Sequence, residues 1–248
     1  MLIQWFPGHM TKTKRMIESH LKAVDVVAEL LDARIPMSSA NPMVEELVQG
    51  KSRIVILNKA DLADPKATDR WISYYQKKNI PVVPMSVGNS KNKKKLLALI
   101  RETAEPMLAK WRKRGIKSRS VRLMILGIPN VGKSTLINFL AGTAATRTAN
   151  TPGHTRGKQW VRLSEGLDLL DTPGVLWPKF DDQVAALRLA ATGAIAGDVF
   201  NADEVVPELL ASLAETAPWV LQEKYDIEDV HQDPQLLLEA AGRRRGCL

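Results

Sequence analysis

The chain has 248 residues, of which 45% are hydrophobic and 25% charged, a balance typical of a globular protein with a buried core. No apolar run approaches the ~20 residues that cross a bilayer, and the start of the chain lacks the apolar segment of a secretory signal. The single cysteine, Cys247, excludes an internal disulfide and fits a reducing cytosol. The formal net charge of +8 favours nucleic acid as a partner over an acidic membrane surface, although a lysine-rich surface without such a partner is the alternative.

The N-terminal segment combines aromatic and basic residues. An aromatic pair at residues 5–6 precedes a break at Pro7-Gly8, after which Ile17, Leu21 and Val24 recur at the spacing of a short amphipathic helix whose other face is basic. The pattern then predicts a buried strand at 24–31 and a helix at 41–49 that has Pro42 at its first position.

The next apolar run, 53–57, predicts a second buried strand that leads directly into Asn58-Lys59-Ala60-Asp61. N-K-x-D after a strand is the guanine-reading motif of GTPases. Asp61 would accept hydrogen bonds from guanine N1–H and the exocyclic amine, Asn58 would help fix O6, and the Lys59 stem would lie along the ring. Four residues alone are weak evidence, because the same string could be a turn that ends a strand and caps a helix.

A short strand at 80–85 is followed by Ser86-Val87-Gly88, a place where small residues brace guanine through backbone N–H groups. Ser86 and Val87 are therefore candidate nucleotide-binding residues. Residues 91–114 predict a strongly basic helix that Pro106 ends or kinks. Its last turn places Trp111 among cations, which is either an RNA contact or an ordinary solvated helix face.

Residues 121–141 combine a strand, a glycine-bounded loop and a helix. The loop, Gly127 to Ser134, fits G-x-x-x-x-G-K-[ST], so its backbone N–H groups and the helix N-terminus would cradle phosphates. Lys133 would reach the β- and γ-phosphates, and Ser134 would ligate Mg²⁺. The alternative is a strand-to-helix turn that merely contains these residue types. The candidate nucleotide-binding residues here are Asn130, Val131, Gly132, Lys133, Ser134 and Thr135.

Residues 142–158 show no apolar periodicity and predict a loop that becomes ordered when a ligand binds. Thr155 would offer its hydroxyl to Mg²⁺ when a γ-phosphate is present, although an ordinary surface loop is the alternative. A hairpin of strands at 159–163 and 167–170 then leads into Asp171-Thr172-Pro173-Gly174. In this D-x-x-G motif Asp171 would hold the Mg²⁺ shell, and the Gly174 N–H would sense the γ-phosphate.

From Pro178 the pattern becomes helical. Helices are predicted at 183–196 with Asp181 or Asp182 as the cap, at 202–213, at 218–225, and at 234–241 with Gly242 as the stop; a basic tail, Arg243 to Arg245, follows. We expect an α/β GTPase domain at 1–177, with a mostly parallel sheet flanked by helices, and a smaller all-α domain at 178–248.

The order of the motifs is unusual. In most GTPases the P-loop precedes N-K-x-D, whereas here N-K-x-D at 58–61 precedes the P-loop at 127–134, so the domain is circularly permuted. A parallel sheet tolerates this order because ligands bind beyond the carboxyl ends of its strands. The D-x-x-G loop then leads directly into the helical domain, so a change at the γ-phosphate could move that domain.

This set of motifs resembles the circularly permuted GTPases that assist ribosome assembly. The resemblance rests on W-F-P-G-H-M at 5–10, D-A-R-I-P at 32–36, and the motifs at 58–61, 127–134, 151–157 and 171–174. It implies a helical RNA-contacting domain and action late in maturation of the large ribosomal subunit and its rRNA. We expect a cytoplasmic monomer without stable membrane association. Family members usually continue beyond the point where this chain stops, so a shortened helical domain is expected.

Two local features bear on hydrolysis. Many GTPases place a water-orienting glutamine after D-x-x-G, but Val175 stands there, and the resemblance suggests His9 as the replacement; the alternative is that residues 5–9 form a packing flap. Asn130 corresponds to an asparagine that in related GTPases helps hold K⁺ against the phosphates, although it could instead bond its own loop. The expected catalytic residues are His9, Lys133, Thr155 and Gly174.

The leading hypothesis is a GTPase that is slow alone and stimulated by the ribosomal subunit, with a GTP form that binds the precursor and hydrolysis that releases it. A second is an RNA-binding assembly factor in which nucleotide mainly stabilises the fold. A third is a GTPase that acts on another RNA, such as tRNA, for which the permuted order is not expected.

Overall fold

A computed structural model describes residues 10–116, 119–142, 160–164, 166–170, 182–195, 197 and 200–247. The described chain forms two compact units, one before residue 171 and one after residue 181. We call them the GTPase unit and the helical unit. The predicted domain boundary at 177/178 lies outside the described residues. None of the described helices combines the length and the apolar character that a bilayer crossing requires.

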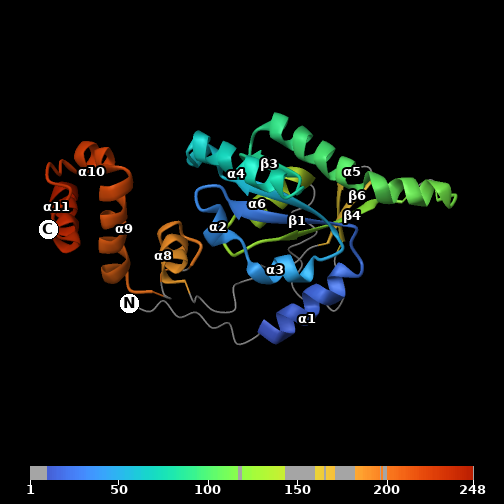
Figure 1. The fold of residues 1–248 in the computed structure, drawn as a ribbon, viewed down its shortest axis with the longest axis horizontal. Coiled ribbons are helices and arrows are strands. Elements are labelled where there is room, and N and C mark those ends of the chain that lie inside the picture. The colour runs from blue at the N-terminus through green and yellow to red at the C-terminus, as the bar shows by residue number, and fades with distance from the viewer. Residues whose placement is uncertain are drawn as a thin grey trace. The chain divides into compact units, whose positions relative to one another are not determined.

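A six-stranded sheet forms the centre of the GTPase unit, in the order β3-β2-β1-β4-β6-β5 (Figure 1). Its strands are β1 (Val26–Asp32), β2 (Ser52–Asn58), β3 (Val82–Met85), β4 (Val121–Leu126), β5 (Trp160–Ser164) and β6 (Leu167–Leu170). All neighbouring pairs are parallel except β5 and β6, which form the predicted antiparallel hairpin. The mostly parallel sheet is therefore confirmed, and each strand lies within about two residues of its predicted position.

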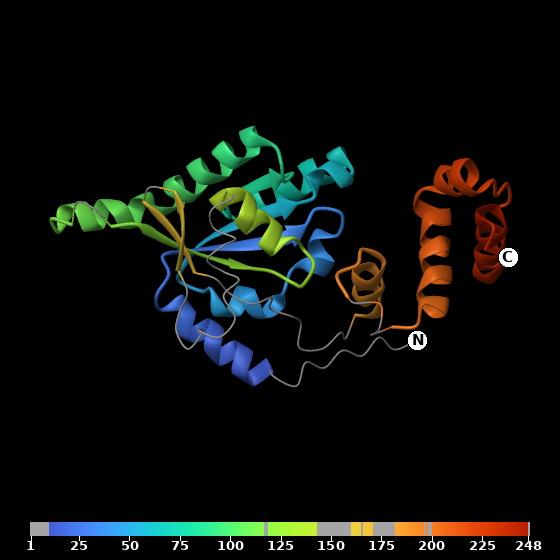
Figure 2. The same cartoon turned by 180° about the vertical axis from the view of Figure 1, so that it is seen from behind.

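Apolar runs rather than alternating patterns encode the central strands, because both faces of the sheet are covered. Every residue of β1 is buried. The helices of this unit are α1 (Met10–Leu21), α2 (Pro36–Ser39), α3 (Pro42–Leu47), the 3₁₀ helix η1 (Ala60–Leu62), α4 (Pro65–Lys77), α5 (Ser90–Lys113) and α6 (Lys133–Ala141). Figure 1 shows α5 on one side of the sheet and α1 with α3 on the other, and Figure 2 shows α6 on the side of α5.

The predicted amphipathic face of α1 is confirmed. Ile17, Leu21 and Val24 are 0%, 5% and 2% exposed and pack with residues of α3, β1 and β4 in one apolar cluster. On the neighbouring part of the sheet, Tyr75 of α4 packs against Leu31 and Leu57. These contacts hold β1, β2 and β4 in position, and the ends of these strands carry the candidate site.

Helix α4 was not predicted, although its start carries a clear signal. The Asp64 side chain accepts a hydrogen bond from the Ala67 N–H at 2.6 Å, and Pro65 occupies the first turn. This pairing of an acidic cap with a proline at the first position is a common way for a helix to begin.

The basic helix predicted at 91–114 is confirmed as α5, and of the two effects expected of Pro106, an end or a kink, the first does not occur, because α5 continues to Lys113. Proline in a helix removes one hydrogen bond, a cost of about 3 kcal/mol that packing can offset. Here Leu96, Ile100 and Ala104 are fully buried before the proline. After it, Trp111 stacks on Arg119, whose Cζ lies 3.9 Å from the ring centroid.

The helical unit contains α8 (Gln183–Ala191), α9 (Ala202–Thr216), α10 (Pro218–Tyr225) and α11 (Pro234–Arg245), and its described residues contain no strand. The all-α prediction is therefore confirmed for the part that the structure describes. Apolar residues of α9, α10, α11 and the segment between α10 and α11 form its own core, which includes Leu210, Ala214, Leu221, Ile227, Val230, Leu237 and Ala241.

Three predicted helix ends in this unit were wrong. Helix α9 continues to Thr216 rather than ending at 213. Helix α8 ends at Ala191 rather than 196, because Gly193 adopts a φ of 73° and the Ala194 N–H returns to the Leu189 carbonyl at 2.8 Å. Helix α11 runs through Gly242 and ends before Gly246, whose φ is 69°. A glycine inside a helix costs only about 1 kcal/mol, so the buried residue Ala241 keeps this turn helical.

Candidate functional site

The predicted motifs meet at the carboxyl edge of the parallel sheet. Strand β1 lies between β2 and β4, and its last residue, Asp32, is in register with Asn58. The N-K-x-D residues 58–61, which we call the base-reading loop, therefore begin two strands away from the P-loop, 127–134. Ligands of open parallel sheets bind at this edge.

Two glycines of the P-loop are required by close approach. A Cβ on Gly127 would lie 2.7 Å from the Leu30 carbonyl oxygen of β1. A Cβ on Gly132 would lie 2.5 Å from Asn58 Nδ2, and Gly132 also has a φ of 100°. The P-loop thus fits against β1 and the base-reading loop only without side chains at these positions.

Helix α6 begins at the end of this loop without a side-chain cap, because its N-cap is Gly132. The N–H groups of its first turn and the positive end of its dipole suit a phosphate. Ser134 and Thr135 are exposed in this turn. A hydroxyl in this place could join the oxygen ligands of Mg²⁺, so Ser134 fits the predicted role.

Lys133 bends back over its own loop. Its Nζ donates to the carbonyl oxygens of Gly127 and Ile128, both at 2.8 Å. Burial lowers the pKa of Lys133 from 10.5 to about 8, because neutral carbonyls compensate the loss of water only in part. A phosphate would supply the negative charge that these carbonyls lack.

Asn58 joins the base-reading loop to the P-loop. Its Nδ2 donates to the Val131 carbonyl oxygen at 2.8 Å, and its buried Oδ1 has no partner among the described residues. Because a carbonyl and the following N–H point in opposite directions in a trans peptide, this bond turns the Gly132 N–H away from the base-reading loop. The predicted contact of Asn58 with guanine O6 remains a prediction.

Lys59 makes a second connection between the two loops. Its backbone is left-handed, with a φ of 58°, and its Nζ donates to the Asn130 carbonyl oxygen at 3.1 Å. The same Nζ binds Asp32 Oδ2 at 3.0 Å. Asn130 itself has a φ of 54°, a conformation that asparagine tolerates better than most residues.

Asp61 lies beside the loop that follows β3. The Ser86 hydroxyl donates a hydrogen bond to Asp61 Oδ1, so the two predicted guanine-binding segments are in direct contact. Asp61 remains exposed, and Val87 next to Ser86 is 38% exposed. An exposed carboxylate in this position can accept from the two guanine donors, whereas adenine offers no equivalent pair.

Four predicted site residues, His9, Thr155, Asp171 and Gly174, lie outside the described residues. Among the residues described, no group of three His, Cys, Asp or Glu side chains could hold a metal ion. Two contacts were missed from the sequence, namely the bond of Asp32 to Lys59 and the side-chain bond of Ser86 to Asp61. The local signals for Asp32 were its place at the end of a buried strand and its position at the start of D-A-R-I-P at 32–36.

The site consists of a glycine loop that precedes an uncapped helix and an N-K-x-D loop that is bonded to the carbonyls of the glycine loop. This arrangement defines the nucleotide site of a P-loop GTPase, here in circularly permuted order. Residues 122–230 match the family described as 50S ribosome-binding GTPase. Ribosome biogenesis GTPase A of Bacillus licheniformis is 45% identical over 248 residues, which cover 100% of this chain and 88% of the relative. The chain belongs to the ribosome biogenesis GTPase A family.

Two more distant matches agree. Mitochondrial ribosome-associated GTPase 1 of Mus musculus is 34% identical over 219 residues, 85% of this chain and 66% of that protein. The crystal structure of GNP-bound YlqF from T. maritima superposes with a TM-score of 0.63 at 25% identity, covering 94% of this chain and 95% of that one. The GTPase activity and the link to ribosome biogenesis follow from this membership, and the resemblance drawn from the sequence motifs is confirmed.

Proposed function

We propose that the chain acts late in maturation of the large ribosomal subunit, where its GTP form binds the precursor and hydrolysis releases it. The observation that carries this proposal is the connected nucleotide site: Asn58 and Lys59 bond the base-reading loop to the P-loop, so base and phosphates are sensed by one framework. The protein would act as a monomer in the cytoplasm.

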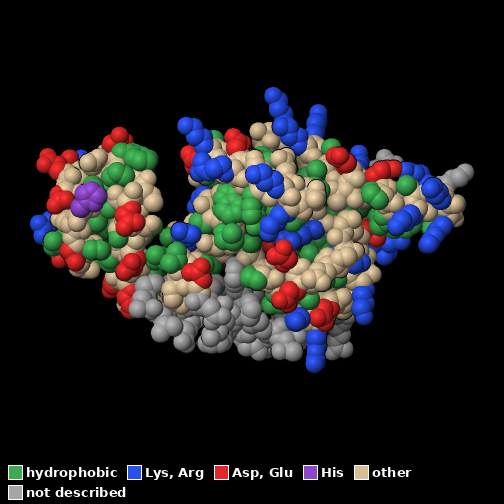
Figure 3. Space-filling model, in the orientation of Figure 1, with side chains coloured by type: hydrophobic (Ala, Val, Ile, Leu, Met, Phe, Trp, Pro, Cys, Tyr) green, Lys and Arg blue, Asp and Glu red, His purple; other side chains and the backbone are tan. Residues whose placement is uncertain are grey.

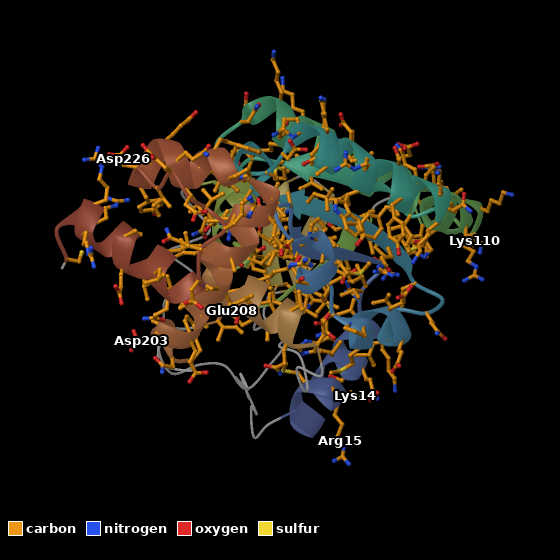
Figure 4. The ribbon with its side chains drawn as sticks, turned by 60° about the vertical axis from the view of Figure 1, so that its left-hand side comes forward. Lys14, Arg15, Lys110, Asp203, Glu208 and Asp226 are labelled. Atoms are coloured by element: carbon orange, nitrogen blue, oxygen red, sulfur yellow. The ribbon has the colours of Figure 1, made fainter. Side chains whose placement is uncertain are left out.

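The charge distribution supports rRNA as the direct partner. Residues 1–178 contain 29 Lys and Arg against 14 Asp and Glu. On the face drawn in Figure 3, basic side chains gather over α4 and α5, and Figure 4 shows Lys14, Arg15 and Lys110 extending from the surface of the GTPase unit. Such clustering is the electrostatic footprint of a nucleic-acid-binding protein.

The helical unit has the opposite balance. Residues 179–248 contain 6 Lys and Arg against 13 Asp and Glu, and Asp203, Glu208 and Asp226 extend from its surface (Figure 4). Its basic residues concentrate at Arg243 to Arg245, at the end of α11. The GTPase unit would therefore supply most rRNA phosphate contacts, and the helical unit would contribute through this tail.

We assign the following roles at the phosphates, of which those of Asp171, Thr155 and Gly174 rest on the sequence motifs alone. Lys133 would exchange its two carbonyl partners for β- and γ-phosphate oxygens. Ser134 would hold Mg²⁺ with Asp171 and Thr155, and the bound ion would neutralise charge on the phosphates. Asn130, next to the loop carbonyls, would help hold K⁺. The Gly174 N–H would sense the γ-phosphate.

His9 is proposed to orient the attacking water, because Val175 cannot donate or accept a hydrogen bond with its side chain. The N-terminal segment would be held over the phosphates only when the protein is docked on the ribosomal subunit. Hydrolysis would then be slow for the protein alone and faster on the subunit.

Cosedimentation with large ribosomal subunits tests the proposal. Binding should be tighter with a non-hydrolysable GTP analogue than with GDP, and it should weaken as salt rises, because neutralised phosphates release counterions. Replacing Arg112 and Lys113 of α5 by alanine should weaken binding and lower the salt slope by about 0.7–0.9 for each phosphate that is no longer neutralised. Lys224→Ala in the helical unit is the matched control and should leave the slope unchanged. Binding that is blind to nucleotide would favour the assembly factor in which nucleotide is structural.

A further inference from the structure

Asp32 occupies a fixed position beside the nucleotide site. It is the last residue of β1, and its side chain is 3% exposed. Its backbone N–H donates to Ser39 Oγ at 3.0 Å, while the Ser39 hydroxyl donates to the Ile35 carbonyl oxygen at 2.9 Å. The strand register also pairs Asp32 with Asn58, where the base-reading loop begins.

The Asp32 carboxylate is the acceptor for two cationic side chains. Oδ1 accepts from the Arg34 backbone N–H at 3.1 Å and from Arg34 Nε at 2.9 Å. Oδ2 accepts from Arg34 Nη2 at 2.7 Å and from Lys59 Nζ at 3.0 Å. A carboxylate that binds Arg34 through both oxygens is held in one orientation, so its remaining lone pair is aimed at Lys59.

The same bonds keep the group ionised. Burial opposes ionisation, but the hydrogen bonds from Arg34 and Lys59 outweigh it, and the pKa of Asp32 lies below its ordinary value of 3.8. Asp32 is therefore a permanent negative charge at neutral pH, surrounded by donors on Arg34 and Lys59.

Lys59 divides its ammonium between this carboxylate and the P-loop. Its Nζ donates to the Asn130 carbonyl oxygen at 3.1 Å. Because the C=O and N–H of a trans peptide point in opposite directions, the Val131 N–H then points away from Lys59. Removing the Asp32 charge would leave Lys59 with a neutral carbonyl partner and a stem that can adopt other rotamers.

We propose that Asp32 is a positioning residue for the nucleotide, because its carboxylate holds Lys59 across the P-loop and beneath the guanine plane. Asp32 touches neither base nor phosphate in this mechanism and acts through Lys59. Its effect is to slow nucleotide release. The inference rests on the proposed contact of the Lys59 stem with guanine.

The test measures release of GDP that carries a fluorescent group on its ribose, by chasing with unlabelled GDP. Asp32→Asn keeps the shape of the side chain and removes its charge. We expect release about tenfold faster than in the wild type, the scale of one lost hydrogen bond to a charged group. Asp25→Asn is the matched control: Asp25 is also poorly exposed and accepts from the Arg119 guanidinium and from the Arg122 backbone N–H, but it precedes β1 at the opposite end of the strand. It should leave release unchanged.

A double-mutant cycle separates positioning from a general loss of structure. In a Lys59→Met background, Asp32→Asn should change release by less than about twofold, because the group through which it acts is already absent. Full additivity of the two changes, or an unchanged release rate in Asp32→Asn alone, would overturn the inference. If the wild type fails to bind labelled GDP, the proposed function itself fails, which is a distinguishable result.

Discussion

The base-reading loop and the P-loop differ in what their charged and polar side chains are bonded to. In the base-reading loop, Asn58, Lys59 and Asp61 are bonded to other segments, namely the P-loop, β1 and the loop after β3. In the P-loop, Lys133 is bonded to carbonyls of its own loop. On the proposed roles, the side chains that would read the base are already held by other segments, whereas Lys133 would exchange its bonds when nucleotide binds.

This difference indicates that nucleotide affinity and the rate of hydrolysis depend on different residues. On the proposed roles, guanine selection depends on bonds between described segments, so a change there should alter affinity. On the same proposal, hydrolysis also depends on His9, which is not part of these bonded segments. Changes of the two kinds should therefore have separable effects on binding and on rate.

The largest expected effect is on the catalytic side. His9→Ala should leave GTP affinity nearly intact and lower the subunit-stimulated rate by about 100-fold or more, the usual scale for a positioned catalytic group. Single-turnover hydrolysis with ribosomal subunits present measures it. His20→Ala is a control on another histidine, in the last turn of α1, and should retain the stimulated rate. If His9→Ala matches the wild type, His9 is only a packing residue.

The next effect breaks the connection between the two loops. Gly132→Ala places a Cβ 2.5 Å from Asn58 Nδ2 at a φ of 100°, so we expect GDP binding to weaken by roughly 1–3 kcal/mol. Gly50→Ala isolates the backbone term, since Gly50 has a φ of 78° and a Cβ added there would meet nothing within 4 Å. Calorimetric titration should show weakened binding for Gly132→Ala alone. Equal binding by both variants would show that the loops are not mechanically connected.

The pKa of Lys133, lowered to about 8 by burial, predicts a pH dependence. As pH rises, Lys133 loses its proton in the folded chain before it does so in the unfolded chain. The free energy of unfolding should therefore rise with pH between about 8 and 10.5, where the unfolded chain binds more protons. Phosphate requires the charged form, so GDP affinity should fall about tenfold between pH 7 and pH 9 through this single proton. Lys133→Met controls for ionisation of guanine and should show a shallower slope. Parallel slopes would mean that Lys133 does not carry the effect.

The smallest expected effect concerns the monovalent ion. If Asn130 helps hold K⁺ at the phosphates, subunit-stimulated hydrolysis should be faster in potassium than in sodium chloride, because the ion would stabilise charge that develops on the phosphates. Asn130→Ser should remove the preference while keeping a polar loop residue. A wild-type rate that is equal in the two salts would exclude this role.

Local motifs made most of the fold and the nucleotide residues predictable. A glycine loop between a buried strand and a helix, and N-K-x-D after another buried strand, each carry their geometry within a few residues. The start of helix α4 is equally local, because Asp64 caps it and Pro65 occupies its first turn. Pro106 does not end α5 and Gly242 does not end α11, because packing offset the local preference of each residue.

Non-local contacts could not be predicted. The bond between Asp32 and Lys59 joins residues 27 positions apart, and it depends on β1 pairing with β2 in one register. Glu29, in the middle of β1, is 1% exposed and paired with Arg53 of β2, a pairing that the prediction of a buried strand at 24–31 did not include. Such pairs follow from strand order, which the sequence pattern alone does not specify.

The most direct test of an arranged guanine site is the nucleotide preference of Asp61→Asn. Dissociation constants for GDP, XDP and ADP should be measured for the wild type, for this variant, and for Asp64→Asn, in which the cap of α4 keeps an acceptor oxygen. We expect Asp61→Asn to lose roughly 2–4 kcal/mol of GDP binding and to gain XDP binding, with Asp64→Asn resembling the wild type. Equal binding of ADP and GDP by the wild type, or no shift toward XDP in the variant, would contradict it.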